Sequence, residues 1–294
     1  MYKYHSMFSK YKTAYRNWIS VLIQLYSGSH YVRVKLKDKT FHEWNHSLVT
    51  SYPDLIRLGL KSDVIDYFDN KKNYFEFNYK KKIIRLYGPK DNKGDIANIF
   101  LDEDYKFLNS ENGIIIDIGA NIADSTIYFA VNGASRVIAL EPYPYSYNYG
   151  VKNIHANLLE EKITLLNYGY GKGNEIKIEE NKITGLSTSL TQSDNGEIIK
   201  LYTLKSLIDE FSLDGDLLLK IDCEGCEYNL LEESENVIKR FERIQIEYHY
   251  GYSKLKEKLE KYGFEVTVTK PFKSYNDKLD DPNRRVGFLY AKRN

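Results

Sequence analysis

The stretch Ile114-Ile-Ile-Asp-Ile-Gly-Ala-Asn-Ile-Ala-Asp-Ser125 decides the fold. Its leading isoleucines are β-branched and apolar, which predicts a strand buried on both faces. Asp117 ends that strand, Gly119 allows a sharp turn close to a ligand, and a helical pattern follows through Thr126–Val131. A strand, a glycine turn and a helix that begins at the turn are typical of the nucleotide-cofactor corner of a doubly wound α/β sheet.

Strands and helices alternate from Gly113 to the end of the chain. This alternation predicts an α/β, Rossmann-like fold with a doubly wound, mostly parallel, seven-stranded sheet and right-handed crossovers. The last two strands have no helix between them, which predicts an antiparallel closing hairpin. The expected strands are Ile114–Ile118, Arg136–Leu140, Ile163–Leu166, Leu217–Ile221, Arg243–Tyr248, Glu265–Thr269 and Val286–Ala291, with short strands at 175–179 and 198–202; the expected helices are Ser125–Asn132, Tyr145–Leu159, Leu204–Phe211, Glu227–Glu232 and Ser253–Tyr262.

The N-terminal part is predicted to be an extension, residues 1–100, ahead of a main domain, residues 101–294. Apolar residues at helical spacing predict one amphipathic helix over Lys10–Ser27. Alternation over residues 73–87 predicts a hairpin. Residues 1–50 are rich in lysine and arginine. We interpret them as a solvated basic face and keep contact with nucleic acid or a membrane surface as the alternative.

The composition is that of a soluble protein with a packed core. The net charge of the 294 residues is +1, which does not indicate a polyanionic partner. No apolar run reaches the roughly 18 residues of a membrane span, and no secretory leader is recognisable, so no transmembrane segment is expected. The chain has 2 cysteines, Cys223 and Cys226, too few for a disulfide framework, which indicates a reducing cytoplasm.

The C-x-x-C spacing of these two cysteines invites a metal or redox interpretation. A structural zinc ion requires four ligands, and the sequence offers no second cysteine pair. A thioredoxin-like pair opens a helix in a different context. We therefore expect Cys223 and Cys226 to pack beside the acidic turn that contains Asp222 and Glu224.

Ligands of doubly wound sheets bind at the carboxyl ends of the strands. Glu141 ends the strand after the first one, where an acid can accept both hydrogen bonds of a ribose diol, and Asp117 can face a ligand's ammonium group. A dinucleotide is the first alternative, because its fingerprint also carries an acid about 20 residues on. That fingerprint has glycine at the position of Asn121, so that a pyrophosphate can approach the backbone. Asn121 therefore favours a ligand without a pyrophosphate.

Five motifs occupy the predicted strand ends. They are Asp117-Ile-Gly-Ala-Asn-Ile-Ala123, Ala139-Leu-Glu-Pro142, Asn167-Tyr-Gly-Tyr-Gly171, Lys220-Ile-Asp-Cys-Glu-Gly-Cys-Glu227 and Gln245-Ile-Glu-Tyr-His249. Over about Asp95–Asn294 the chain resembles the FkbM-type S-adenosylmethionine-dependent methyltransferases, which have the class I methyltransferase fold. The Lys-Ile-Asp-x-Glu-Gly-x-Glu string is the most specific part of this resemblance. Ala123 departs from it, since the family usually has glycine there, and alanine is expected to keep φ below zero.

The resemblance implies an S-adenosylmethionine-dependent methyltransferase. It implies that Asn167 and Tyr168 flank the adenine ring of the cofactor. The cofactor-binding residues that follow from it are Asp117, Gly119, Asn121, Ser125, Glu141, Pro142, Asn167, Tyr168 and Asp222.

An acidic cluster follows the fourth parallel strand. We expect Asp222 and Glu224 to face the cofactor and the acceptor as catalytic groups, whereas Glu227 either joins them or complements a helix dipole. His249 is a candidate base or acceptor-orienting group, with a structural histidine as the alternative. No metal ligand is assigned, although Asp222, Glu224, Glu247 and His249 could hold a divalent cation.

The acceptor atom is expected to be oxygen, because the Asp/Asn-Pro-Pro-Tyr/Phe string of amino-directed nucleic-acid methyltransferases is absent. The predicted acceptor is a hydroxyl on a sugar, glycan, lipid or secondary metabolite. The alternative is a nucleic acid that docks on the basic residues 1–50. Acceptor contacts are expected from the loops Thr184–Gly196, Tyr250–Ser253 and Pro271–Asn283.

Overall fold

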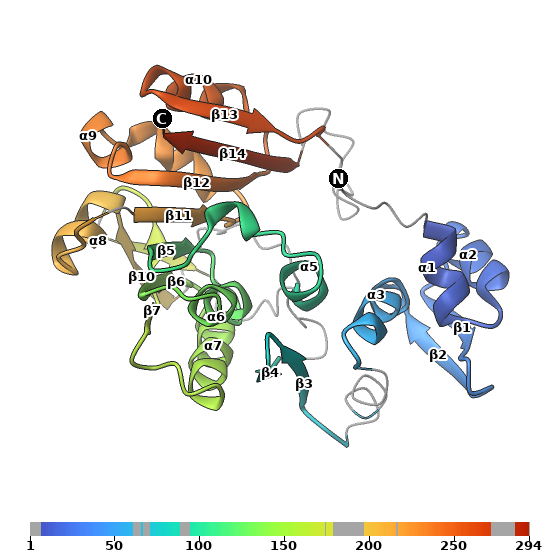
Figure 1. Cartoon of the computed structure of the whole chain (residues 1–294). Helices are drawn as coiled ribbons and strands as arrows, with labels where there is room; N and C mark the ends of the chain where they lie inside the picture. Colours follow the sequence, from blue (N-terminus) through green and yellow to red (C-terminus); the bar gives the residue numbers. More distant parts are fainter. Residues whose placement is uncertain are drawn as a thin grey trace. The chain divides into compact units, whose positions relative to one another are not determined.

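The structure is a computed structural model (Figure 1) and describes residues 7–60, 66, 71–88, 95–173, 175–178, 197–215, 217–271 and 286–293. The chain divides into two compact units. One consists of Met1–Arg85 with Asp95–Asp102, and the other of Leu86–Gly94 with Glu103–Asn294. The predicted loop Thr184–Gly196 and all but the first residue of Pro271–Asn283 lie outside the described residues.

The second unit contains a seven-stranded sheet with the order β13-β14-β12-β11-β5-β6-β7. Neighbouring strands pair in parallel from β12 to β7, and β14 is antiparallel to both β12 and β13. This order confirms the predicted doubly wound sheet with its antiparallel closing hairpin, and it is that of the class I methyltransferase fold. The strands are β5 (Ile114–Ile118), β6 (Arg136–Leu140), β7 (Ile163–Leu166), β11 (Leu217–Ile221), β12 (Phe241–Tyr248), β13 (Phe264–Val268) and β14 (Gly287–Arg293).

Side chains alternate between the two faces of this sheet. One face packs an apolar core in which Ile116, Leu219 and Ile246 meet Leu207 and Leu255 from two helices. The helices and 3-10 turns of the unit are η1 (Lys106–Leu108), α6 (Asp124–Val131), α7 (Pro144–Ala156), α8 (Leu204–Glu210), η2 (Cys226–Glu232), α9 (Glu235–Ile238) and α10 (Ser253–Lys261). The segment predicted as a helix at Glu227–Glu232 is therefore a 3-10 turn, and a separate helix follows it.

The opposite face of the sheet carries a row of polar side chains across three strands. Lys220 of β11 is in register with Asp117 of β5 and with Gln245 of β12. Gln245 donates to the carbonyl of Asp104 at 2.9 Å, and Arg243 donates to that of Phe107 at 2.7 Å. These bonds hold the segment around η1 against the face on which Asp117 and Lys220 lie.

A smaller three-stranded sheet has the order β8-β10-β9. It consists of β8 (Gly169–Tyr170), β9 (Glu175–Ile178) and β10 (Glu197–Tyr202), and β10 is antiparallel to β9 and parallel to β8. The two short strands expected at 175–179 and 198–202 are confirmed.

The first unit shows that the single helix predicted over Lys10–Ser27 is wrong. The chain forms α1 (Met7–Ala14) and α2 (Trp18–Tyr26) instead. Tyr15 breaks the helix because it pairs with Leu36 in an antiparallel bridge. The Asn17 side chain then bonds the backbone of Arg33 at 2.9 Å and of Lys35 at 2.7 Å, so the break is fixed by contacts with a strand that comes later in the chain.

The same unit contains elements that the sequence did not predict. These are the antiparallel pair β1 (Tyr31–Lys35) and β2 (Phe41–Asn45) and the helix α3 (His46–Arg57). The predicted hairpin over residues 73–87 is confirmed as β3 (Tyr74–Tyr79) and β4 (Lys82–Tyr87), and α5 (Ile96–Phe100) follows. No helix of the described residues is long and apolar enough to cross a membrane.

Candidate active site

The glycine turn after β5 touches the end of the neighbouring strand β11. Gly119 has φ +80°, and a Cβ there would lie 1.7 Å from the carbonyl oxygen of Asp222. The backbone N–H groups of Gly119 and Ala120 both donate to the carbonyl of Leu140 at the end of β6. Glycine is therefore required at this position both for its conformation and for its lack of a side chain.

Two further residues of the turn have a left-handed backbone. Asn121 has φ 49° and Ala123 has φ 65°. The expectation that Ala123 keeps φ below zero is wrong. The turn retains the geometry that suits glycine, and the alanine bears a conformational cost of about 1–2 kcal/mol. Asn153 of α7 helps to hold this geometry, because its side chain donates to the carbonyl of Ile122 at 2.8 Å.

Asp117 and Lys220 form a buried ion pair beneath the turn. Asp117 is 0% exposed and Lys220 2% exposed, and Nζ lies 3.0 Å from Oδ1 of Asp117. Asp117 also accepts hydrogen bonds from the hydroxyls of Ser125 at 2.8 Å and Thr126 at 2.7 Å, while Nζ of Lys220 donates to the carbonyl of Gly119 at 2.7 Å. The polar groups of Asp117 and Ser125 are thus used inside the protein and support the turn from below.

Lys220 keeps its charge in this surrounding. Burial alone would lower its pKa, but the carboxylates of Asp117 and Asp222 outweigh burial and raise the pKa above the ordinary value. Lys220 lies in a predicted motif, yet the sequence analysis gave it no role. A lysine inside the apolar strand Leu217–Ile221 is the signal that could have identified it, because a buried charge has to be paired.

Glu141 closes the turn on the side of β6. Its carboxylate accepts the backbone N–H of Asn121 at 2.7 Å through Oε2 and that of Tyr143 at 2.9 Å through Oε1. The side chain is buried, and burial raises its pKa to about 7 although the two backbone N–H groups and Lys220 favour the charged form. Glu141 is therefore a carboxylate whose ionisation lies near neutral pH.

Asn167 and Tyr168 follow β7 beside this carboxylate. The amide of Asn167 donates to the carbonyls of Glu141 at 2.9 Å and Pro142 at 3.0 Å, so it fixes the end of β6. The Tyr168 ring stacks on Tyr202 with 4.8 Å between ring centroids. Asn167 therefore lies against the Glu141 turn, and the role of Asn167 and Tyr168 beside an adenine stays a prediction.

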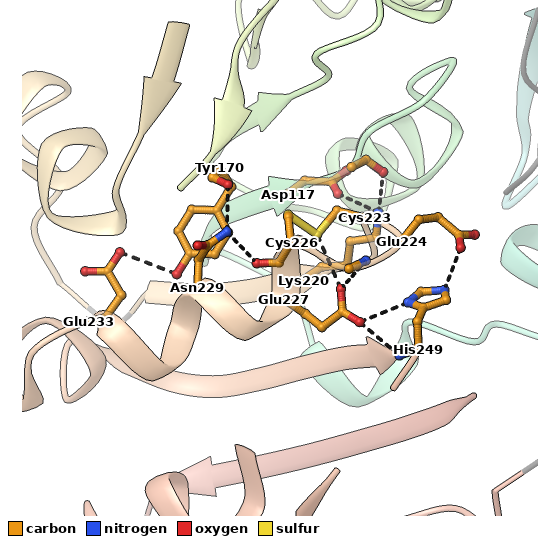
Figure 2. The surroundings of a disulfide bond; sticks show 12 residues. Asp117, Tyr170, Lys220, Cys223, Glu224, Cys226, Glu227, Asn229, Glu233 and His249 are labelled. Atoms are coloured by element: carbon orange, nitrogen blue, oxygen red, sulfur yellow. Dashed lines mark hydrogen bonds and ion pairs between the residues drawn. A yellow bond between two sulfur atoms is a disulfide. The ribbon is translucent and has the colours of Figure 1, made fainter. Parts of the chain in front are cut away.

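The acidic cluster after β11 is built around His249, which directly follows β12. Nδ1 of His249 lies 3.1 Å from Oε1 of Glu227, and Nε2 lies 3.3 Å from Oε2 of Glu224 (Figure 2). Glu227 is fully buried and also accepts the backbone N–H groups of Gly225 at 2.7 Å and of His249 at 2.9 Å. Glu227 is therefore a buried bridging group between the turn and β12. Asp222 accepts from the hydroxyl of Tyr105 at 3.4 Å.

The two glutamates hold His249 in its charged form. Burial would lower the pKa of the imidazole, but hydrogen bonds and charge from Glu224 and Glu227 raise it to about 11. An imidazolium has no free lone pair at neutral pH, which argues against the predicted role of His249 as a base. Its contacts indicate that it orients Glu224.

The two cysteines are joined, which corrects the expectation that they pack as free side chains. Cys223 and Cys226 form a disulfide with 5.5 Å between their Cα atoms (Figure 2). The sulfur of Cys223 lies 3.7 Å from Oε2 of Glu227. The spacing alone does not predict this bond, because a C-x-x-C pair also fits a metal ligand set, a redox motif or packing residues.

A divalent cation at Asp222, Glu224, Glu247 and His249 was the open alternative. Within the described ranges, no group of three or more His, Cys, Asp or Glu side chains could hold a metal ion. In the structure, both ring nitrogens of His249 face carboxylates.

Fold and strand-end residues together define the class of the protein. The strand order is that of class I methyltransferases, and the carboxyl ends of β5, β6 and β11 bring Gly119, Glu141 and Asp222 into one region. A family model described as the methyltransferase FkbM domain matches residues 117–266, just over half of the 294 residues. The chain therefore belongs to the FkbM methyltransferase family.

Other known proteins are similar over shorter stretches or at lower identity. A tRNA(Phe) (4-demethylwyosine(37)-C(7)) aminocarboxypropyltransferase of Pyrococcus horikoshii is 35% identical over 54 residues, which are 18% of this chain and 19% of that protein. The chain thus covers about a fifth of that relative. M. jannaschii TYW2 in complex with AdoMet is 18% identical over 76% of this chain and 86% of its own, with a TM-score of 0.41. Precorrin-6y C5,15-methyltransferase of Geobacter metallireducens is 16% identical over 70% of this chain and 93% of its own, with a TM-score of 0.38.

Proposed function

We propose that this enzyme transfers the methyl group of S-adenosylmethionine to a hydroxyl oxygen of a sugar, glycan, lipid or secondary metabolite. The cofactor part of the proposal rests on the contacts of Glu141. Each of its carboxylate oxygens accepts one backbone N–H and retains a second acceptor position. Two acceptor positions on one buried carboxylate suit the two hydroxyls of a ribose, and the turn at Asn121 has no glycine for a pyrophosphate.

The other predicted cofactor residues divide into two groups. The first group belongs to the glycine turn: Gly119 and Asn121 form the turn, and Asp117 and Ser125 support it from below. The second group lies at the ends of the strands and consists of Pro142, Asn167, Tyr168 and Asp222, which would surround the nucleoside and the methionine part.

The bound cofactor supplies a methyl group on a positively charged sulfur. The chain has to align the acceptor oxygen, a contribution that can reach about 7–11 kcal/mol in favourable cases, and to remove its proton. We assign the proton to the carboxylate of Glu224, whose side chain is 25% exposed and which His249 holds through Nε2. Asp222 orients the acceptor beside it, and His249 acts as a positioning residue for Glu224.

Calorimetry with S-adenosylmethionine tests the cofactor part. The wild-type chain should bind, and Glu141→Gln should weaken binding at least about tenfold, since it replaces a carboxylate that accepts charge-assisted hydrogen bonds. Glu257→Gln changes an exposed glutamate on α10 and is the matched control. Failure of the wild type to bind, or equal binding by Glu141→Gln, would remove the basis of the proposal.

Transfer of a radiolabelled methyl group tests the acceptor part. Panels of free sugars, glycans and lipid extracts should include a substrate that the wild type labels on oxygen. Glu224→Gln should lower the rate by about 10²–10⁴ with little change in cofactor binding, which is the range for loss of a general base. Label found on nitrogen or carbon of the product would contradict the choice of a hydroxyl acceptor.

A nucleic-acid acceptor is the second candidate, favoured by the name of the P. horikoshii relative, which acts on a tRNA. The structure weakens the basic docking surface expected for it. Within residues 1–50, Lys10 lies 3.0 Å from Asp54, and Lys37 donates to the carbonyl of Lys12 at 2.7 Å. These two cations thus have partners within their own unit. Salt-dependent RNA binding that is lost when residues 1–50 are deleted would favour this candidate.

A further inference from the structure

The disulfide encloses the residue to which the proton is assigned. Cys223 and Cys226 flank Glu224 and Gly225 in the turn between β11 and η2. Both enclosed residues have a left-handed backbone, with φ 55° at Glu224 and φ 125° at Gly225. A non-glycine residue pays about 1–2 kcal/mol for such a conformation, so an open chain would leave it readily. The covalent ring limits the conformations that remain.

The turn is connected to both halves of the site. On one side, the carbonyl of Asp222 lies against Gly119, where a Cβ would be 1.7 Å away. On the other side, Glu224 contacts His249 at 3.3 Å (Figure 2). The N–H of Gly225 donates to Glu227 at 2.7 Å. A change in the backbone at Glu224 and Gly225 therefore moves the Glu224 carboxylate relative to His249.

We propose that the Cys223–Cys226 disulfide is a redox-sensitive positioning element that holds Glu224 against His249. A dithiol reduces it in a two-electron step: the S–S bond breaks, two S–H bonds form, and the dithiol becomes a disulfide. The freed turn lets Glu224 leave His249. The reduced enzyme then loses its aligned base; this consequence for catalysis rests on the proposed function.

The surroundings of the two cysteines fit this role better than the alternatives. Both side chains are partly exposed, so a small dithiol can reach them. A zinc role would require two more ligands, and the described residues provide no such group. A purely structural staple remains as the competing account, and it predicts that reduction changes stability without moving Glu224 relative to His249.

The titration of His249 by NMR distinguishes these accounts, because its pKa reports the neighbouring Glu224. In the oxidised protein, the His249 ring should stay protonated at pH 9, as expected for a pKa of about 11. After reduction with dithiothreitol and alkylation of both thiols, the pKa should fall by at least about one unit. His249→Gln assigns the resonance. His155, an exposed histidine paired with Glu160, is the internal control and should not respond.

Two variants make the test specific. Cys223→Ser/Cys226→Ser should show the lowered His249 pKa without any reductant, which avoids the bulk of the alkyl groups. In Glu224→Gln, the His249 pKa should already be lower in the oxidised protein, and reduction should lower it little further. An unchanged His249 titration after reduction, or an equal response in Glu224→Gln, would overturn the proposal.

Binding of S-adenosylhomocysteine separates this inference from the proposed function. If neither redox form binds it, the proposed function fails, although a redox-dependent His249 titration would still support the positioning role. If both forms bind it and the titration does not change, the positioning role fails alone.

Discussion

Replacement of Lys220 by methionine tests whether the buried ion pair supports the glycine turn. Methionine has similar length and fills the space of the lysine stem, so the main loss is the charge. Asp117 would keep the hydroxyls of Ser125 and Thr126 but lose its cation, and the carbonyl of Gly119 would lose its donor. Removal of one partner of a buried pair costs about 3–5 kcal/mol, because the other charge stays buried without compensation.

Urea unfolding followed by circular dichroism measures this loss. The chain contains 2 tryptophans, Trp18 and Trp44, both in the first unit. Their fluorescence transition should therefore stay unchanged while the transition of the second unit moves to lower urea. Lys205→Met removes an exposed lysine that pairs with Asp209 on α8, and should cost no more than about 1 kcal/mol.

A double-mutant cycle with Asp117→Asn shows whether the loss belongs to the pair. Lys220→Met and Asp117→Asn together should cost less than the sum of the two single changes, because the double variant leaves no unpaired charge. A loss below about 1 kcal/mol in Lys220→Met, or strict additivity of the two changes, would refute the role given to the pair.

Four further results are expected. The affinity for S-adenosylmethionine, measured by calorimetry, should rise roughly tenfold from pH 6 to pH 8. The reason is that Glu141, with a pKa of about 7, must be ionised to accept both ribose hydroxyls. Binding by Glu141→Gln should show no such pH dependence. The stability of the ligand-free protein should change in the opposite direction, since a raised carboxyl pKa contributes stability below pH 4.5 that is lost as the pH rises through about 7. Gly119→Ala should lower the free energy of unfolding by at least about 3 kcal/mol and abolish cofactor binding. Gly59 has φ +84°, and a Cβ there would meet nothing within 4 Å. Gly59→Ala should therefore cost only the conformational part, about 1–2 kcal/mol. Ala123→Gly should change the free energy of unfolding by less than about 1 kcal/mol, because relief of the left-handed backbone is offset by the entropy of the unfolded chain and the lost methyl contact. A larger loss of stability would contradict the conformational cost assigned to Ala123.

The sheet could be predicted from sequence because its strands are short apolar runs separated by helices. Each strand position is a local property of the chain, and the handedness of the crossovers restricts the possible strand orders. The break at Tyr15 could not be predicted in this way. It depends on Leu36 and on the bond from Asn17 to Lys35, so the helical spacing on either side gives no sign of it.

In the site, too, the features set by neighbouring residues can be predicted from sequence, and those set by distant contacts cannot. The positions of Glu141 and Asp222 at strand ends follow from the strands themselves. Whether Asp117 faces a ligand or the protein interior depends on Lys220, which lies far along the chain and becomes its neighbour only through the register of β5 and β11. The charge state of His249 likewise depends on glutamates of another segment. Residue type and spacing predict which groups lie at the strand ends, but the pairing of these groups depends on partners that are distant in the sequence.

The contact between Gly119 and Asp222 connects the two parts of the site mechanically. Lys220 fixes the carbonyl of Gly119 from below, and the carbonyl of Asp222 occupies the space above the missing side chain of Gly119. The ion pair therefore determines where the glycine turn lies, and the glycine turn limits where the chain after β11 can go. Because interiors are close-packed, a shift at either residue is passed to the other. The placement of Glu224 thus depends on the buried pair as well as on the disulfide.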